Sequence, residues 1–335
     1  MVQNKSLIYA DHPTGFPEPG KHIKIETTDF DTEQTPPPGG LTVKVHDVSY
    51  DPYQRGRMRP ATVKSYAPPF TLGKPITNSA IVTVLKSSND KFKPGQLLLA
   101  GRGNTEEYSL YSQTEADSCK VLENPFDLDP KLFLGALGMP GLTAYSSFYA
   151  IGKPKRARRS SSPPLREPSA SSVGDAKKLD FITSELKFDG GFNYKAEKPS
   201  EALARLAPEG IDIYYENVGG EQLEAAIGAM KPWGRIVACG MISQYNKPAE
   251  EAYGIKNLMQ VVAKRITMRG FIVSDPDMGP IYAADHQKNV QKWIHEGTFK
   301  AQQSVTYGID NAAEGLLGMF EGKNFGKAVL EISKL

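Results

Sequence analysis

Ile211-Asp212-Ile213-Tyr214-Tyr215-Glu216-Asn217-Val218-Gly219-Gly220 is a short apolar run that ends in a tight glycine turn. On either side of it, runs of this kind alternate with segments of helical periodicity. We expect strands over residues 211–215, 234–239 and 266–273, and helices over residues 176–186, 222–230 and 283–295. Single short strands separated by helices predict a parallel sheet and a doubly wound α/β domain.

The chain before residue 125 has a different pattern. Short β-rich pieces over residues 6–10, 41–50, 76–85 and 96–100 are separated by Pro/Gly stretches such as residues 35–40. This pattern is typical of an all-β, barrel-like domain. A helix over residues 311–320 and a strand over residues 328–333 indicate that the chain returns to this first domain. We therefore expect one domain of residues 1–125 plus 305–335, and a second of residues 126–304.

Composition excludes several classes of function. The 335 residues include 40 basic and 38 acidic ones, so neither sign is in the excess that nucleic acid or an anionic membrane would attract. Cys119 and Cys239 lie far apart without metal-ligand spacing, so we expect no metal site. The sequence starts without an apolar signal-like stretch and contains no run of membrane-spanning length. We expect a cytoplasmic protein.

Four motifs carry a resemblance to a known family. Together they resemble the zinc-independent medium-chain dehydrogenase/reductases, within them the branch of the prostaglandin reductases, leukotriene dehydrogenases and plant alkenal double-bond reductases. The resemblance covers nearly the whole chain in order. The motifs are Asp51-Pro-Tyr-Gln-Arg-Gly-Arg-Met58, Gly138-Met-Pro-Gly-Leu-Thr-Ala-Tyr145, Tyr215-Glu-Asn-Val-Gly-Gly220 and Cys239-Gly-Met-Ile-Ser-Gln-Tyr-Asn246.

The resemblance implies a fold and a reaction. It implies a GroES-like β-barrel domain joined to a Rossmann domain, with the active site in the cleft between them. It also implies NADPH-dependent reduction of the C=C bond of a small hydrophobic α,β-unsaturated aldehyde or ketone. Hydride delivered to the β-carbon leaves negative charge on the carbonyl oxygen as an enolate, and hydrogen-bond donors aimed at that oxygen would be catalytic. A homodimer is the assembly that the resemblance suggests.

Catalytic roles transfer where the motifs are intact. Tyr245 would lie beside the nicotinamide ribose and help to position the enolate, and the alternative is a loop tyrosine that faces solvent. Tyr53 and Arg55 would line the substrate cleft, with Tyr53 as a second catalytic candidate. Gln54 replaces a methionine that is usual in the family, which changes the polarity of the pocket.

The cofactor roles rest on the same resemblance. Lys178 and Tyr194 match a pair that grips the 2′-phosphate of NADP, and this favours NADPH over NAD, although a lysine in the first turn of a helix is ordinarily just solvated. Asn217 would touch the cofactor or else cap its turn. Residues 271–273 would offer backbone groups to the carboxamide or else form a buried strand. The cofactor-binding set is Lys178, Tyr194, Asn217, Cys239, Gly240, Met241, Ile242, Ser243, Gln244, Tyr245, Phe271, Ile272, Val273 and Asn324.

Residues 156–172 conflict with this interpretation. They are mainly Arg, Ser and Pro, with Leu165 as the one large apolar residue, so we expect a disordered segment or surface loop. In the family this position holds a strand, a Gly-rich turn, a helix whose N-terminus binds the diphosphate, and a second strand. We interpret all four as missing and the first βαβ unit as disrupted. Their loss is expected to cost most of the cofactor affinity.

The neighbouring reading frame offers an explanation. Codons for residues 157–172 can be chosen so that this frame spells Glu-Thr-Ile-Phe-Val-Ser-Ala-Ala-Ser-Gly-Ala-Val-Gly-Gln-Leu, which resembles the strand and phosphate loop of the family. We call this sequence the alternate-frame peptide. We hypothesise a frame slip near Lys155, with further sequence lost before the frame recovers at about Val173. Genomic DNA in which no one-base shift restores the peptide would disprove the hypothesis.

Three interpretations of function remain. The first is an NADPH-dependent alkenal or enone reductase in detoxification or in tailoring a metabolite. The second is carbonyl or quinone reduction on the same scaffold. The third is a catalytically dead chain, damaged by the frame slip.

Overall fold

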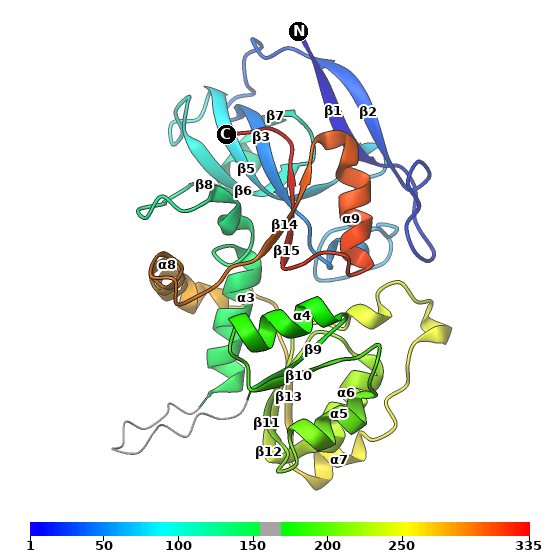
Figure 1. Ribbon diagram of the computed structural model, residues 1–335. Helices are drawn as coiled ribbons and strands as arrows, with labels where there is room; N and C mark the ends of the chain where they lie inside the picture. Colours follow the sequence, from blue (N-terminus) through cyan, green and yellow to red (C-terminus); the bar gives the residue numbers. More distant parts are fainter. Residues whose placement is uncertain (155–168) are drawn as a thin grey trace. The chain divides into compact units, whose positions relative to one another are not determined.

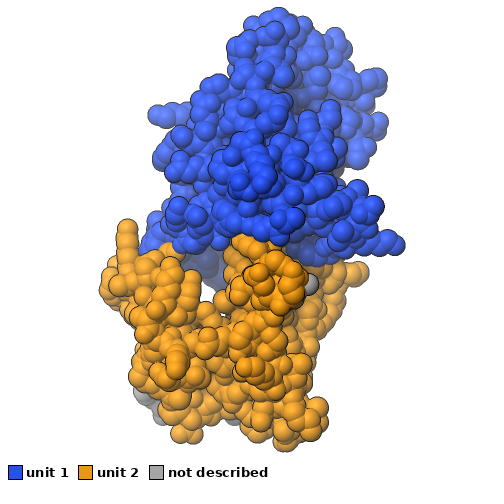
Figure 2. Space-filling view, turned by 90° about the vertical axis from the view of Figure 1, so that its right-hand side faces the viewer, with its two compact units in different colours: residues 1–140, 289–335 blue, residues 141–288 orange. Residues whose placement is uncertain are grey.

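A computed structural model describes residues 1–154 and 169–335. It divides into two compact units, residues 1–140 with 289–335 (unit 1) and residues 141–288 (unit 2), which Figure 2 colours separately. The sequence placed these boundaries near 125 and 305. The difference arises because the flanking segments pack on unit 1: the ring centroids of Phe126 and His295 lie 4.7 Å apart, and Phe133 and Leu134 are buried.

Unit 1 is built from two sheets (Figure 1). The strand order is β2-β1-β4 in the smaller sheet, and β14-β15-β3-β5-β6-β8 with β7 also paired to β3 in the larger one. Every pairing is antiparallel except that of β14 with β15. The strands are β1 (Val2–Tyr9), β2 (Ile23–Phe30), β3 (Leu41–Ser49), β4 (Lys74–Pro75), β5 (Thr77–Ser87), β6 (Leu97–Asn104), β7 (Tyr108–Tyr111), β8 (Cys119–Val121), β14 (Gln303–Tyr307) and β15 (Lys327–Glu331).

The core of unit 1 follows from the apolar residues of these strands. Val43, Val45 and Val48 of β3 are fully buried, and so are Ala80 and Val82 of β5. The expected return of the chain to this domain is confirmed, because β15 pairs antiparallel with β3. The helical elements are α1 (Gln54–Arg57), α2 (Gln113–Asp117), η1 (Pro130–Leu134), η6 (Ile309–Asn311) and α9 (Ala312–Phe320).

Unit 2 alternates strands and helices, as predicted. Its pairings are all parallel, but the described strands form two separate sheets, β10-β9 and β11-β12-β13. The strands are β9 (Ala170–Val173), β10 (Gly190–Asn193), β11 (Ile211–Glu216), β12 (Met230–Ala238) and β13 (Thr267–Gly270). The helical elements are α3 (Met139–Ser147), η2 (Phe148–Gly152), α4 (Ala176–Asp180), η3 (Phe181–Glu185), α5 (Pro199–Leu206), α6 (Gly220–Ala229), η4 (Ile242–Gln244), η5 (Ala249–Glu251), α7 (Met259–Ala263) and α8 (Gly279–His295), of which α3 and α8 cross the unit boundaries.

Two expectations are wrong in part. Residues 170–172 were expected in a disordered segment or surface loop, but they form β9 with Val173 and pair parallel with β10, so the second strand of the disrupted unit is present. Residues 156–168 of that segment lie outside the described residues. The strand expected over residues 266–273 ends at Gly270, because the Asp275 carboxylate accepts a 2.8 Å hydrogen bond from the Ile272 N–H and turns the chain.

Candidate active-site residues

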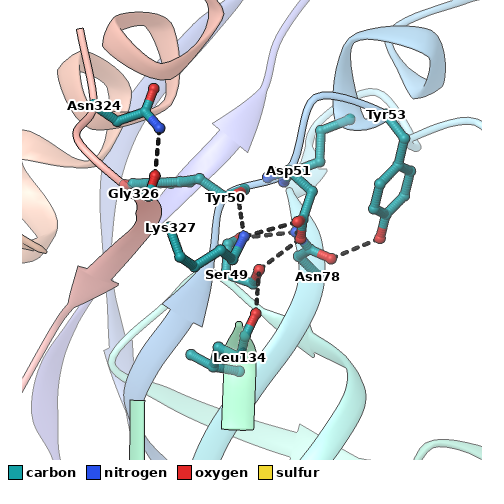
Figure 3. A network of polar contacts seen from close by, with 10 residues as sticks. Ser49, Tyr50, Asp51, Tyr53, Asn78, Leu134, Asn324, Gly326 and Lys327 are labelled. Atoms are coloured by element: carbon teal, nitrogen blue, oxygen red, sulfur yellow. Dashed lines mark hydrogen bonds and ion pairs between the residues drawn. The ribbon is translucent and has the colours of Figure 1, made fainter. Parts of the chain in front are cut away.

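Tyr53 is anchored in unit 1 by a buried amide. It immediately precedes α1, and its hydroxyl donates a 2.6 Å hydrogen bond to Asn78 Oδ1 (Figure 3). Asn78 lies on β5, is fully buried, and donates from Nδ2 to Ser49 O at 2.7 Å and to Asp51 Oδ2 at 2.9 Å. Burial raises the pKa of Tyr53 to about 12, so its hydroxyl remains protonated at neutral pH.

Behind Asn78 stands an ion pair between residues distant in the chain. Lys327, the first residue of β15, lies with Nζ 2.7 Å from Asp51 Oδ1 and also donates to the carbonyl oxygen of Tyr50 (Figure 3). The side chains of Lys327 and Asp51 are only 14% and 7% exposed, and Ser49 Oγ donates to Asp51 Oδ2 at 2.5 Å. The pair therefore fixes Asp51, which together with Asn78 orients the Tyr53 hydroxyl.

The neighbours of Tyr53 have structural contacts of their own. The buried guanidinium of Arg55 donates to the carbonyl oxygens of Gly15 at 2.7 Å and Pro13 at 3.3 Å, so it ties down the loop after β1. Gln54 is also buried and accepts the N–H of Asp51 at 2.8 Å through Oε1. The polarity that Gln54 brings is therefore satisfied by the backbone.

Asn324 lies in the turn before β15. It is half-buried, and its Nδ2 donates to the Gly326 carbonyl oxygen at 2.6 Å, as Figure 3 shows. Gly326 has a φ of +83°, and a Cβ there would lie 2.2 Å from the Gln302 carbonyl oxygen, so this turn requires glycine. The turn holds Asn324 close to the start of the strand that supplies Lys327.

Tyr245 of unit 2 folds back over its own turn. It follows η4, and its hydroxyl accepts the N–H of Met241 at 3.3 Å. A Cβ on Gly240 would lie 2.9 Å from that hydroxyl, so glycine is what lets the ring approach the backbone this closely. Burial raises the pKa of Tyr245, which keeps the hydroxyl protonated at neutral pH.

The turns after β11 and β12 are joined by backbone hydrogen bonds. Ile242 N–H donates to Asn217 O and Ser243 N–H donates to Val218 O, each at 3.0 Å. The N–H groups of Cys239 and Gly240 both donate to Glu216 O at 3.0 Å. Asn217 and the segment from Cys239 to Tyr245 therefore share one rigid edge, at the carboxyl ends of parallel strands where doubly wound folds bind ligands.

Glu216 is a residue that sequence reasoning missed. It is fully buried, and one carboxylate oxygen accepts from the N–H groups of Val218 and Gly219, the latter at 2.7 Å. Its other oxygen, Oε2, accepts no hydrogen bond from the residues that the structure describes, and burial raises the pKa of the carboxyl. An acidic residue directly before Asn-Val-Gly-Gly was the available signal, because such a side chain caps the amides of the turn.

Lys178 lies in the first turn of α4, which follows β9, and Tyr194 directly follows β10. Asp175 caps α4 by accepting the Lys178 N–H at 2.8 Å, and Lys178 Nζ lies 3.6 Å from the same carboxylate. The Tyr194 N–H donates to the Val173 carbonyl oxygen at 3.1 Å, and a Cβ on Gly174 would lie 3.0 Å from the Tyr194 hydroxyl. Both residues therefore follow the carboxyl ends of paired strands, Lys178 after β9 and Tyr194 after β10.

Phe271, Ile272 and Val273 follow β13 as an extended exit from the sheet. Phe271 is buried, and the other two are half-buried. Their backbone is held by the turn to Asp275, and the Val273 carbonyl oxygen accepts the Gly279 N–H at 2.8 Å.

The described residues fit the two ends of a dinucleotide better than its middle. Two helices of unit 2 start close to these edges, and carboxylates already occupy both starts, Asp175 at α4 and Glu216 at α6. The sequence contains no glycine between Gly152 and Gly174, where the Gly-rich turn for the diphosphate was expected. A matching turn for the diphosphate is therefore absent from the part of the chain that the structure describes.

Two further searches covered the same described residues. No three side chains among His, Cys, Asp and Glu gather closely enough there to hold a metal ion. None of the helices described is both long enough and apolar enough to cross a membrane.

Comparisons with known proteins match almost the whole chain. Two family profiles match, "N-terminal domain of oxidoreductase" over residues 5–119 and "Zinc-binding dehydrogenase" over residues 170–293. An NADP-dependent oxidoreductase of Cochliobolus heterostrophus is 49% identical over 350 aligned positions, which cover 100% of this chain and 99% of the relative. The NADP-dependent 2-alkenal reductase of Nicotiana tabacum is 36% identical, with 99% and 98% of the two chains covered.

The fold agrees with these matches. The crystal structure of CurA from Vibrio vulnificus in complex with NADPH superposes with a TM-score of 0.84 at 27% identity, covering 99% of this chain and 100% of that one. With full-length matches in sequence and in fold, the chain belongs to the zinc-independent medium-chain dehydrogenase/reductases, in the branch that includes the 2-alkenal and curcumin reductases.

Proposed function

We propose that this protein is an NADPH-dependent reductase that saturates the C=C bond of small hydrophobic α,β-unsaturated aldehydes or ketones. The observation that carries the proposal is the Tyr245 hydroxyl, held protonated at the carboxyl edge of a parallel sheet. The similarity to a 2-alkenal reductase supports this choice of substrate, and the NADPH named for the CurA structure supports the cofactor.

NADPH, when bound, would supply a hydride to the β-carbon of the substrate, and the negative charge would then gather on the carbonyl oxygen as an enolate. The chain's task is to stabilise that enolate oxygen and to direct a proton to the α-carbon. Tyr245 donates its O–H to the enolate oxygen, and a neutral phenol can do this because burial keeps it protonated. Tyr53 and Arg55 would line the substrate side, and Asn78 sets the direction of the Tyr53 hydroxyl.

Cofactor binding is assigned to the edges described above. Lys178 and Tyr194 would hold the 2′-phosphate at the edge of β9 and β10, and Asn217 and residues 239–245 would hold the nicotinamide half at the edge of β11 and β12. The backbone of residues 271–273 would meet the carboxamide, and Asn324 would be a further cofactor contact. These assignments leave the diphosphate without a counterpart among the described residues.

The decisive assay follows NADPH oxidation at 340 nm with a short 2-alkenal. It compares the chain as written with a chimera in which residues 156–169, which precede β9, are replaced by the corresponding segment of the Cochliobolus relative. Because the diphosphate site is lacking, we expect activity in the chimera and little or none in the chain as written. Equal activity in both would refute this account of cofactor binding.

The product separates the two enzymatic interpretations. A saturated aldehyde supports C=C reduction, whereas an allylic alcohol, or turnover of quinones alone, supports carbonyl or quinone reduction. In the chimera, Tyr245→Phe should lower kcat by about 100- to 1000-fold, since it removes one donor to the enolate. Tyr307→Phe, at an exposed tyrosine of β14, should leave kcat unchanged and serves as the control.

The catalytically dead alternative has its own test. A ligand of the native state must raise the thermal midpoint, so NADPH that leaves the midpoint of the chain as written unchanged but raises that of the chimera would mark the written chain as inactive. The cytoplasmic location and the homodimer stay part of this proposal. Sedimentation velocity of the chimera tests the dimer.

A further inference from the structure

We propose that unit 2 has a strand position between β9 and β11 that none of the described strands fills, and that the sequence suited to it is the apolar Thr-Ile-Phe-Val-Ser portion of the alternate-frame peptide. β9 is hydrogen-bonded only to β10, and β11 only to β12, so each has one unpaired edge among the described strands. Unpaired edges on short parallel strands are unusual, because parallel sheets are normally buried and continuous.

The two edges belong to one sheet by their connections. β10 leads through α5 to β11, and such a strand-helix-strand crossover places its strands parallel in a common sheet. A direct contact links the two sides: Ser172 Oγ, on β9, donates to Gln222 Oε1 at 2.8 Å, and Gln222 lies on α6, which follows β11. The separation between the sheets is therefore a local interruption.

Burial agrees with a side of β11 that no described strand covers. Its sequence, Ile-Asp-Ile-Tyr-Tyr, is that of a covered strand, yet Ile211, Ile213 and Tyr215 are only half-buried. On the adjacent β12, Ile236 and Val237 are fully buried. Because the two strands are hydrogen-bonded side by side, the difference points to missing cover on the side of β11 that faces away from β12.

The residues of the chain as written do not suit this position. A central parallel strand needs apolar side chains on both faces and a donor at every ladder position, whereas Pro163, Pro164 and Pro168 lack that donor. The alternate-frame peptide does supply an apolar β-branched run followed by small residues. The 350 positions aligned with the Cochliobolus relative exceed the 335 residues here, so at least 15 positions of that relative have no counterpart in this chain.

Hydrogen exchange tests the proposal without requiring turnover. The chain as written is compared with the chimera and with a control chimera that carries proline in the middle of the transplanted strand. In the chimera, amides of β9 and β11 should exchange roughly tenfold or more slowly than in the written chain, while β12 changes little. The proline control should resemble the written chain, because proline cannot complete the ladder.

Three outcomes of the exchange experiment would overturn the proposal. They are equal protection of β9 and β11 in the written chain and the chimera, equal gains in both chimeras, and exchange of β12 at the random-coil rate in the written chain, since the accepting edges would then not exist. A dimer of the written chain with protected β11 amides would likewise show that a second copy fills the position. A chimera that gains protection but oxidises no NADPH would refute the proposed function and leave this inference standing.

Discussion

Replacing Lys327 by methionine should destabilise unit 1 by about 3 kcal/mol. The substitution keeps the length of the side chain but removes the ammonium that lies 2.7 Å from Asp51 Oδ1. Breaking a buried ion pair by removing one partner costs roughly 3–5 kcal/mol, because the remaining charge stays desolvated. We expect the lower end, since Ser49 Oγ and Asn78 Nδ2 still donate to the Asp51 carboxylate. In a unit of this size the midpoint should fall by about 6–12 °C.

Native-state hydrogen exchange in β3 and β15 measures this loss within unit 1. Asp51→Asn strands the Lys327 ammonium in turn, so the double variant should cost less than the two single ones together, by about 2 kcal/mol. The control is Lys91→Met, which removes an exposed pair with Asp117 and should cost less than about 0.5 kcal/mol. If Lys327→Met cost no more than Lys91→Met, the pair would not support unit 1, and our argument for the orientation of Tyr53 would fail with it.

Three further predictions concern stability and reactivity. Burial raises the pKa of Asp47 to about 7 from an unfolded value of 3.8. The stability that the protonated carboxyl contributes is therefore present below pH 4 and is lost as the pH rises through 7. In urea unfolding between pH 5 and pH 8, Asp47→Asn should flatten the fall of the unfolding free energy with pH. Gly103→Ala would place a Cβ 2.6 Å from the Cβ of Ala80 on β5 and should lower stability by about 1–3 kcal/mol in urea unfolding. Gly101→Ala on the same strand would meet nothing nearer than 3.6 Å and should be neutral. Burial raises the pKa of the Cys119 thiol to about 12 and also raises that of Cys239. A disulfide reagent at pH 8 should therefore label both thiols far more slowly in the native protein than in urea. Rapid native labelling of Cys119 would contradict its burial.

The sequence predicted the elements whose burial shows in their pattern. β11 was expected over residues 211–215 and spans Ile211–Glu216, and α9 was expected over 311–320 and spans Ala312–Phe320. β2 was missed, because its sequence Ile-Lys-Ile-Glu-Thr-Thr-Asp-Phe is mostly exposed and carries no clear alternation of apolar residues. An exposed strand of a small sheet can thus form through pairing with β1 while leaving little hydrophobic signal.

The polar network of unit 1 could not be predicted from local pattern at all. Asp51 and Lys327 are 276 positions apart, and Tyr53 meets Asn78 across 25 positions. The motif Asp-Pro-Tyr-Gln-Arg indicated that its residues matter, but it could not show that Tyr53 and Arg55 would face different partners. Only the pairing of β15 with β3 brings Lys327 to Asp51, and that pairing is a tertiary event.

β9 shows why the proposed interruption in unit 2 is confined to one strand position. Backbone pairing is open to almost any sequence, whereas burial is not, and the Ala-Ser-Ser-Val of β9 pairs fully with β10 while its side chains stay exposed or half-buried. The packing of this pair falls on β10 instead: a Cβ on Gly191 would lie 2.7 Å from Ile182 and 2.8 Å from Leu179, so η3 and α4 press directly on its backbone. A strand beside β11 would be part of a parallel sheet that is covered on both faces, so it must supply apolar side chains of its own. A sequence poor in apolar residues therefore suits β9 but not the position beside β11. Replacing one continuous segment for this reason tests both the proposed strand and the proposed diphosphate site.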